Sequence, residues 1–171
     1  MRPMIRPAER SDLDNVALVN VKSWRTVCQG RVSPTRIEAF TIGECLSNWR
    51  YRFGQLDIRG EKLLVADRSG VEGFVYFGPS KDLDIDATAC GQIYLLYVQP
   101  DAFGTGAGKA LMEQALASLG VDGLLHTSLW VLEMNQRARV FYSRQGFSPD
   151  GSVDVDNRTG TPRLRYQRWR C

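Results

Sequence analysis

Apolar residues recur three or four positions apart in four parts of the chain, and this periodicity predicts four helices. In the second of them, Thr41 stands three residues before Glu44, the spacing of a capping box at a helix start. Gly146 follows the fourth, where a residue in the left-handed conformation would end the helix. The predicted helices cover residues 11–27, 41–53, 104–119 and 135–145.

Shorter runs of apolar, β-branched and aromatic residues predict six strands. Residues 92–98 form an almost continuous apolar run, which suits a central strand buried on both faces. Arg68-Ser69-Gly70 separates two of the strands and is typical of a hairpin turn. Residues 163–169 alternate in polarity, and we expect them to form an edge strand. The predicted strands cover residues 4–6, 62–67, 72–77, 92–98, 124–132 and 163–169.

These elements predict an α/β fold, because residues 92–132 contain a strand, a glycine turn, a helix and a second strand. The 171 residues, 43% of them hydrophobic, suffice for one core, so we predict a single domain over residues 1–171. The net charge of +3 is too small to argue for a nucleic-acid partner.

The N-terminus and the cysteines exclude several other classes of protein. Residues 1–10 lack the apolar run of a signal peptide or membrane anchor, so we expect a cytoplasmic protein with no membrane partner. His126 is the single histidine and no two cysteines are close in sequence, so neither a zinc site nor a disulfide framework is expected. The cysteines are Cys28, Cys45, Cys90 and Cys171.

A glycine-rich segment, residues 103–109, lies between a predicted buried strand and a predicted helix. Unpaired backbone N–H groups and the positive end of the helix dipole meet there, and glycine allows a phosphate to approach the backbone closely. The dinucleotide pattern G-x-G-x-x-G fails because Lys109 occupies its last glycine position. The nucleoside-triphosphate loop also fails, because Phe103 replaces its first glycine and Ala110 its hydroxyl residue.

Residues 98–111, V-Q-P-D-A-F-G-T-G-A-G-K-A-L, resemble the coenzyme A motif [RQ]-x-x-G-x-[GA] of the GNAT superfamily of N-acetyltransferases. Residues 129–135 and 138–147 are similar to the next strand and helix of that family, including its Asn and its F-Y-x-x-x-G-F. The resemblance implies a mixed central β-sheet with helices on both faces, in which two adjacent strands splay to admit the pantetheine arm. It also implies acetyl-CoA as co-substrate, with no metal required.

The resemblance also implies which residues bind the cofactor. The backbone of the central strand would pair with the pantetheine arm, and the amides of the glycine-rich segment would hold the pyrophosphate. Phe103 stands where the family usually has Arg or Gln, so we expect weaker cofactor affinity. Asn135 matches a cofactor-contacting position, although helix capping explains it equally well. The implied residues are Leu96, Tyr97, Val98, Phe103, Gly104, Thr105, Gly106, Ala107, Gly108, Lys109 and Asn135.

Tyr142 matches the tyrosine that in many family members donates a proton to the departing thiolate, and it is the predicted catalytic residue. The base for the incoming amine is open, because Gln92 stands where relatives often carry Glu, and glutamine is no base. His126, Glu133 and the acidic loop formed by residues 82–86 stay candidates.

The acidic loop contains Asp82, Asp84 and Asp86, which would either attract a cationic substrate or form a solvated loop. It does not match a calcium loop, since its sixth and twelfth positions lack the required Gly and Glu. A second segment, with Trp24, Arg25, Trp49 and Tyr51, resembles the acceptor side of the pocket, with both tryptophans mainly in the core.

The function predicted from these observations is direct transfer of an acetyl group from acetyl-CoA to a primary amine of a small molecule or peptide. A non-catalytic acyl-CoA-binding or regulatory protein of the same fold is the main alternative. Another is transfer to a protein N-terminus or a tRNA-linked amine. Residues 163–170 are basic, but strand alternation explains them without RNA, and such an edge strand could pair across a homodimer.

Overall fold

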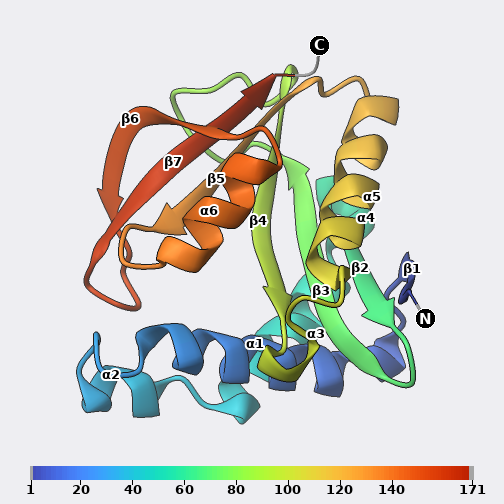
Figure 1. The fold of residues 1–171 in the computed structure, drawn as a ribbon. Helices are drawn as coiled ribbons and strands as arrows, with labels where there is room; N and C mark the ends of the chain where they lie inside the picture. Colours follow the sequence, from blue (N-terminus) through green and yellow to red (C-terminus); the bar gives the residue numbers. More distant parts are fainter. Residues whose placement is uncertain (1, 170–171) are drawn as a thin grey trace.

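The computed structural model describes residues 2–169 and contains a seven-stranded sheet with helices on both faces (Figure 1). The helices are α1 Leu13–Cys28, α2 Pro34–Ala39, α3 Ile42–Phe53, α4 Leu56–Arg59, α5 Ala107–Val121 and α6 Gln136–Arg144, with 3-10 turns η1 Arg10–Asp12 and η2 Pro100–Ala102. The strands are β1 Met4–Pro7, β2 Lys62–Asp67, β3 Val71–Pro79, β4 Cys90–Val98, β5 His126–Leu132, β6 Ser148–Val155 and β7 Pro162–Trp169.

The sheet has the strand order β1-β2-β3-β4-β5-β7-β6 and is mixed. Strands β1 to β4 form an antiparallel meander, and β5, β7 and β6 form a second antiparallel set. The two sets meet at β4 and β5, which are parallel because helix α5 returns the chain to the same end of the sheet. The predicted α/β fold with helices on both faces is confirmed.

Strand β3 shows why both faces of the sheet are covered. Phe74 and Tyr76 pack with α1 and α3 on one face, whereas Val75 and Phe77 pack with α5 on the other. Successive side chains of a strand point to opposite faces, so a continuously apolar strand needs a layer of helix on each side. Each face therefore has its own hydrophobic core.

The central strands β4 and β5 separate partway along their length. Residues 90–93 of β4 pair with residues 126–129 of β5, and no pairing between the two strands extends beyond Ile93. At this point the register between β3 and β4 skips Tyr94, because Phe77 lies opposite Ile93 and Tyr76 opposite Leu95. An extra residue in one strand bends that strand, and this irregularity coincides with the start of the separation.

The prediction that residues 163–169 form an edge strand is wrong. Strand β7 lies between β5 and β6 and is hydrogen-bonded on both sides, so it has no free edge for pairing across a dimer. The edge is β6, which was not predicted because Pro149, Asp150 and Gly151 are typical of loops. It pairs with β7 around a register shift between Pro149 and Val153.

Two further sequence expectations concern the membrane and the cysteines. In residues 2–169 no helix has both the length and the apolar character needed to cross a bilayer. Cys28, Cys45 and Cys90 are buried free thiols. Arg170 and Cys171 lie outside the described residues.

The packing around Gly73 predicts that this position accepts no side chain. A Cβ atom added there would lie 2.8 Å from the Tyr97 carbonyl oxygen and 3.0 Å from Val98 Cγ2. We expect Gly73→Ala to lower the free energy of unfolding by about 1–3 kcal/mol, measured by urea denaturation. The control is Gly43→Ala in α3, where nothing lies within 4 Å. It should be neutral or stabilise by up to about 1 kcal/mol, and equal effects would contradict this account.

Candidate active site

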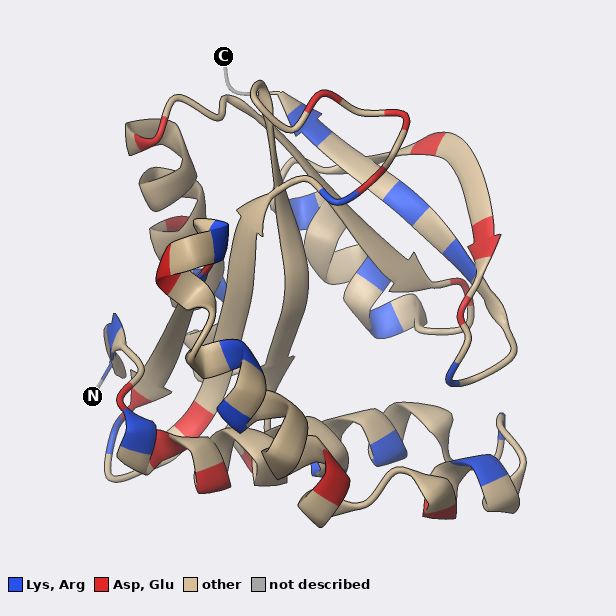
Figure 2. Cartoon of the chain, turned by 180° about the vertical axis from the view of Figure 1, so that it is seen from behind, with Lys and Arg blue, Asp and Glu red and all other residues tan. Residues whose placement is uncertain are grey.

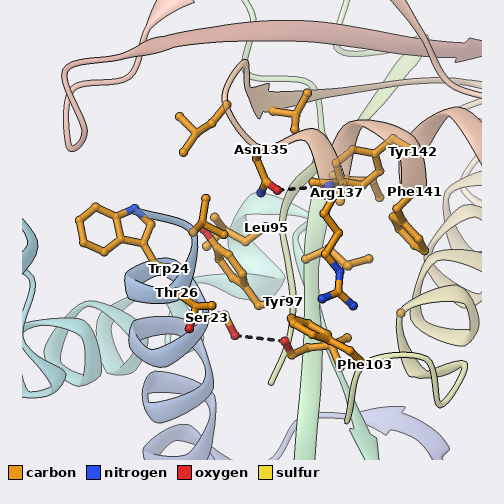
Figure 3. Close-up of a pocket in the computed structure, with 18 of the residues that line it drawn as sticks. Ser23, Trp24, Thr26, Leu95, Tyr97, Phe103, Asn135, Arg137, Phe141 and Tyr142 are labelled. Carbon is orange, nitrogen blue, oxygen red and sulfur yellow. Dashed lines mark hydrogen bonds between the residues drawn. The ribbon is translucent and has the colours of Figure 1, made fainter. Parts of the chain in front are cut away.

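A cavity of about 670 Å³ opens where β4 and β5 diverge. Its walls come from β4, β5, the start of α5, helix α6 and helix α1. Figure 3 shows Ser23 and Trp24 of α1 on one side of it, and Arg137 and Phe141 of α6 on the other. Because α1 covers one face of the sheet and α5 and α6 cover the other, the cavity passes through the gap between the two strands.

The glycine-rich segment borders one end of this cavity and has several unpaired amides. Gly104 and Gly106 adopt φ angles of 78° and 89°, in the left-handed region that favours glycine. The amides of Phe103, Thr105 and Ala107 donate to oxygens of the same turn. Within the described residues, the amides of Gly104, Gly106, Gly108 and Lys109 make no hydrogen bond. The first turn of α5 thus presents free donors to the cavity, as an anion requires.

The guanidinium group of Arg137 stacks on the aromatic ring of Phe103. The guanidinium carbon of Arg137 lies 3.2 Å from the centre of the Phe103 ring, and both side chains line the cavity (Figure 3). Arg137 comes from the start of α6, so the contact joins two segments far apart in sequence. The sequence analysis did not single out Arg137. Its position two residues after Asn135 was the available signal, but the stacking partner is visible only in the fold.

The outer half of β4 lines the middle of the cavity. Leu96, Tyr97 and Val98 all contribute to its wall, as predicted for residues that border the pantetheine arm. The Val98 carbonyl already accepts a hydrogen bond from Ser23 Oγ at 3.2 Å, which ties α1 to this strand. Burial raises the pKa of Tyr97 above its ordinary value, so this phenol stays neutral.

Tyr142 lies in α6 and its side chain reaches the cavity from the side of β5. The residue is 8% exposed, and its hydroxyl makes no hydrogen bond with any residue from 2 to 169. Burial raises the pKa of Tyr142 to about 12, because the charged phenolate is poorly solvated there. The hydroxyl is consequently a protonated, unengaged donor.

Asn135 caps a helix and also lies in the wall of the cavity. Its side-chain oxygen accepts a hydrogen bond from the Ala138 amide at 3.2 Å and so caps α6 (Figure 3). The residue also lines the cavity. Capping and cofactor contact are therefore compatible in this structure.

Aromatic side chains and a single carboxylate also line the cavity. Trp24, Tyr94 and Trp130 line it, and Asp156 is the one acidic residue among all the described cavity-lining residues. Asp156 follows β6, in the turn that leads to β7. Sequence analysis passed over it because that stretch resembled an unstructured connection.

The residues considered as bases for the amine lie elsewhere. His126 is at the far end of β5, where Nε2 lies 2.8 Å from the Gln167 side-chain oxygen and the ring stacks on Trp169. Gln92 is buried and accepts a hydrogen bond from the Lys81 amide. Glu133 is exposed. None of the three lines the cavity.

The acidic loop of residues 82–86 is engaged with a buried arginine. Arg165 of β7 is 6% exposed and binds Asp84 through two hydrogen bonds of 2.7 Å. It also contacts Asp82 and, at 2.6 Å, Asp150. Figure 2 shows acidic segments of this loop and of β6 on either side of the basic residues of β7. The loop is therefore fixed to β7 through Arg165, and Asp82 and Asp84 are not free to act as an anionic patch.

Of the four residues predicted to form the acceptor side of the pocket, only Trp24 lines the cavity. Trp24 is buried and lines the cavity. Trp49 is fully buried in the core, where it contacts Phe74 edge to face. Tyr51 is exposed, and neither it nor Arg25 belongs to the cavity wall.

Comparison of the sequence with known proteins identifies the family to which the chain belongs. Residues 59–149, more than half of the chain, match the family described as Acetyltransferase (GNAT) domain. An uncharacterized N-acetyltransferase of Mycobacterium tuberculosis is 30% identical over 83% of this chain and 86% of its own. A mycothiol acetyltransferase of Beutenbergia cavernae is 42% identical, but over only 47% of this chain and 26% of that protein.

The solved structures show a similar fold. The crystal structure of the paia N-acetyltransferase from Thermoplasma acidophilum, in complex with coenzyme A, has a TM-score of 0.78 and covers 99% of both chains at 23% identity. The family match makes this chain an acyltransferase. The chain belongs to the GNAT acetyltransferase family.

The Arg165 network predicts a pH-dependent contribution to stability. Arg165 holds the pKa of Asp84 below its usual range by hydrogen bonding. Burial acts to raise the pKa of Asp150, but hydrogen bonds from Ser152 and Arg165 outweigh it and keep that pKa low as well. A carboxyl group whose pKa is lower in the folded than in the unfolded protein stabilises the fold above about pH 4, near its unfolded pKa. This stabilisation is lost as the pH falls through the folded-state pKa.

We therefore expect Arg165→Met to lower the free energy of unfolding by about 2–4 kcal/mol at pH 7 and by clearly less at pH 3, measured by urea denaturation. Arg163→Met is the control, since Arg163 pairs with Asp154 at the surface. Its effect should stay within about 1 kcal/mol. An equal loss for Arg165→Met at both pH values would show that lost packing, and not charge, is responsible.

Proposed function

We propose that this protein transfers the acetyl group of acetyl-CoA to a primary amine of a small molecule or peptide, by direct attack in a ternary complex. The observation that carries the proposal is one continuous cavity. It extends from the free amides of the glycine-rich segment, past the unpaired half of β4 and Tyr142, to the aromatic wall beside Asp156. Such a cleft lets two substrates meet in the middle of the sheet.

The residues present fit coenzyme A. The four free amides at Gly104, Gly106, Gly108 and Lys109 would hold the pyrophosphate, with the dipole of α5 adding attraction for the anion. The separation of β4 from β5 leaves room for an extended arm that pairs with strand backbone, as a strand would. Asn135 lies along the same path.

Acetyl-CoA supplies a thioester when bound. The amine nitrogen forms the new C–N bond as the C–S bond breaks, and the amine loses one proton. Amides of the outer half of β4 would donate to the thioester oxygen. Tyr142 would give its hydroxyl proton to the departing sulfur, its burial keeping that proton in place until then, and it would regain a proton through water from the one that the amine releases. A cytoplasmic location is part of the proposal, since the reaction draws on acetyl-CoA.

The role of Tyr142 is tested by Tyr142→Phe, which removes only the hydroxyl. We expect thiol release in the presence of an accepted amine to fall about 100-fold, because the sulfur loses its proton donor. The dissociation constant for acetyl-CoA, measured by calorimetry, should change less than about twofold. Unchanged thiol release would assign Tyr142 to packing alone.

The pH dependence gives a second readout of the same group. Since the pKa of Tyr142 is raised to about 12, its donor form persists throughout the accessible range. With the amine saturating, the rate of thiol release should therefore rise from pH 6 to pH 10, as more of the bound amine becomes neutral, without a falling limb. A fall above pH 8 in the wild type that Tyr142→Phe abolishes would contradict the raised pKa.

Arg137 is tested for phosphate binding, a role that the apolar side chain of Phe103 cannot fulfil. The stack on Phe103 places the Arg137 guanidinium beside the glycine-rich segment, where it can bind a phosphate. We expect Arg137→Met to raise the dissociation constant for acetyl-CoA about tenfold or more. Arg139→Met is the matched control, because Arg139 instead contacts Tyr166 and the Glu133 carbonyl. It should change the constant less than about twofold.

The phosphate that Arg137 contacts can be identified with dephospho-CoA, which lacks the ribose phosphate. Contact with the pyrophosphate predicts the same loss of affinity for coenzyme A and for dephospho-CoA in Arg137→Met. A loss for coenzyme A alone would assign Arg137 to the ribose phosphate instead. Equal binding by Arg137→Met and the wild type would remove Arg137 from the cofactor site.

A further inference from the structure

Asp156 occupies an unusual position for an acidic side chain. It is half-buried in the turn between β6 and β7 and lines the cavity. The charged residues that line the cavity with it, Arg31, Lys109, Arg137 and Arg163, are all basic. Asp156 therefore supplies the single negative charge among the described side chains that line the cavity.

The turn holds Asp156 rigidly through one of its two carboxylate oxygens. Oδ1 accepts hydrogen bonds from the Thr159 amide at 2.8 Å and from the Thr159 hydroxyl at 3.0 Å. Thr159 is itself buried, and the backbone of Asp156 pairs with Gly160 and Thr161. The other oxygen, Oδ2, accepts no hydrogen bond from any residue that the structure describes. The turn therefore fixes the side chain and leaves one oxygen for a ligand.

The neighbouring basic side chains are engaged with other groups. Arg163 forms an ion pair with Asp154 at 2.7 Å, and Arg31 donates to the Met134 carbonyl at 3.1 Å. Arg158 lies over the Phe40 ring. Across residues 2–169, Asp156 has no ion-pair partner. Its negative charge is thus available to a cation that enters the cavity.

The charge of Asp156 acts on the interior of the cleft. Burial first and the Asp156 carboxylate second raise the pKa of the Cys28 thiol to about 11, although Arg31 acts to lower it. The same carboxylate contributes to the raised pKa of Tyr97, after burial and nearby titrating groups. Both groups belong to elements that border the cavity, α1 and β4. The carboxylate therefore favours positive charge on the acceptor side of the sheet.

We propose that Oδ2 of Asp156 binds the protonated amine of the acceptor, and that the acceptor therefore arrives as an ammonium ion beside an apolar or aromatic group. This rests on the proposed transferase function and names the residue that selects its substrate. Trp24, Tyr94 and Trp130 line the same cavity and offer aromatic surface to an apolar group beside the ammonium, while Lys81 already lies over the Tyr94 ring and Arg163 over the Trp130 ring. The amine then loses a proton to water and attacks from this side, toward Tyr142.

The test compares Asp156→Asn with Asp154→Asn. Asparagine keeps the side-chain oxygen that accepts from Thr159, so the turn is preserved while the charge is removed. Asp154 is exposed, lies two residues earlier in β6 and does not line the cavity. Thiol release from acetyl-CoA is measured with alanine, an alanyl peptide, glucosamine, spermidine and 2-phenylethylamine, and the best acceptor is used for both variants.

We expect Asp156→Asn to raise KM for that amine about 10- to 100-fold, as the loss of a charge-assisted hydrogen bond predicts. The value of kcat should change less than about threefold, and so should the dissociation constant for acetyl-CoA, which also reports that the variant is folded. Asp154→Asn should change none of the three by more than about twofold. Asp156→Glu, which keeps the charge, should have a lower KM than Asp156→Asn.

The outcomes separate this inference from the function on which it rests. Thiol release by the wild type with an unchanged KM in Asp156→Asn would overturn the role of Asp156 alone. A loss of kcat with no change in KM would also overturn it, because binding would then not be the step affected. No release with any amine in the wild type would overturn the transferase proposal and this inference together.

Discussion

The separation of β4 from β5 after Ile93 is the constraint on which the rest of the site depends. Buried backbone N–H and C=O groups need hydrogen-bond partners, and beyond Ile93 the groups of β4 and β5 that face the gap lack them, although β4 still pairs with β3 and β5 with β7. The skipped Tyr94 bends β4 away at that point. The result is a cleft lined by strand backbone, which an extended ligand can complete in the way that a missing strand would.

Several contacts hold the two halves of the sheet around this cleft. Ser23 binds the Val98 carbonyl and joins α1 to the end of β4. On the other side, Asp82 accepts hydrogen bonds from Trp130 of β5 and from Arg165 of β7, so the loop before β4 is tied to the second set of strands. These contacts bridge the divergence without filling it. An open cleft in the centre of a domain is stable only with such supports, because it forgoes the packing of a closed sheet.

The two ends of the cavity differ in their electrostatics. One end has free amides, the positive end of α5 and Arg137, and so favours an anion. The other has aromatic walls and the single carboxylate of Asp156. Between them, burial keeps Tyr142 neutral. The replacement of the usual Arg or Gln by Phe103 fits this division, because the aromatic ring supports an arginine from a different helix at the same end.

Much of this protein could be predicted from local patterns in the sequence. Helical and strand periodicity, the capping residues Thr41 and Asn135, and the glycine-rich turn depend on neighbouring residues, so the order of most elements, the βαβ unit and the anion-binding end were readable directly. Strand β6 was missed because its stability comes from pairing with β7 and not from its own composition, and the position of β7 inside the sheet followed from that pairing.

The acceptor end of the site depended wholly on tertiary structure. His126 and Glu133 were reasonable candidates by residue type, but their places in the fold put them outside the cavity. Asp156 gave no signal in a connecting segment. The sequence by itself determined the family, the order of most elements and the glycine-rich turn, because those features are encoded in consecutive residues. Only the fold decided which distant side chains share the cavity, because that depends on where the strands separate and which turns return to the gap.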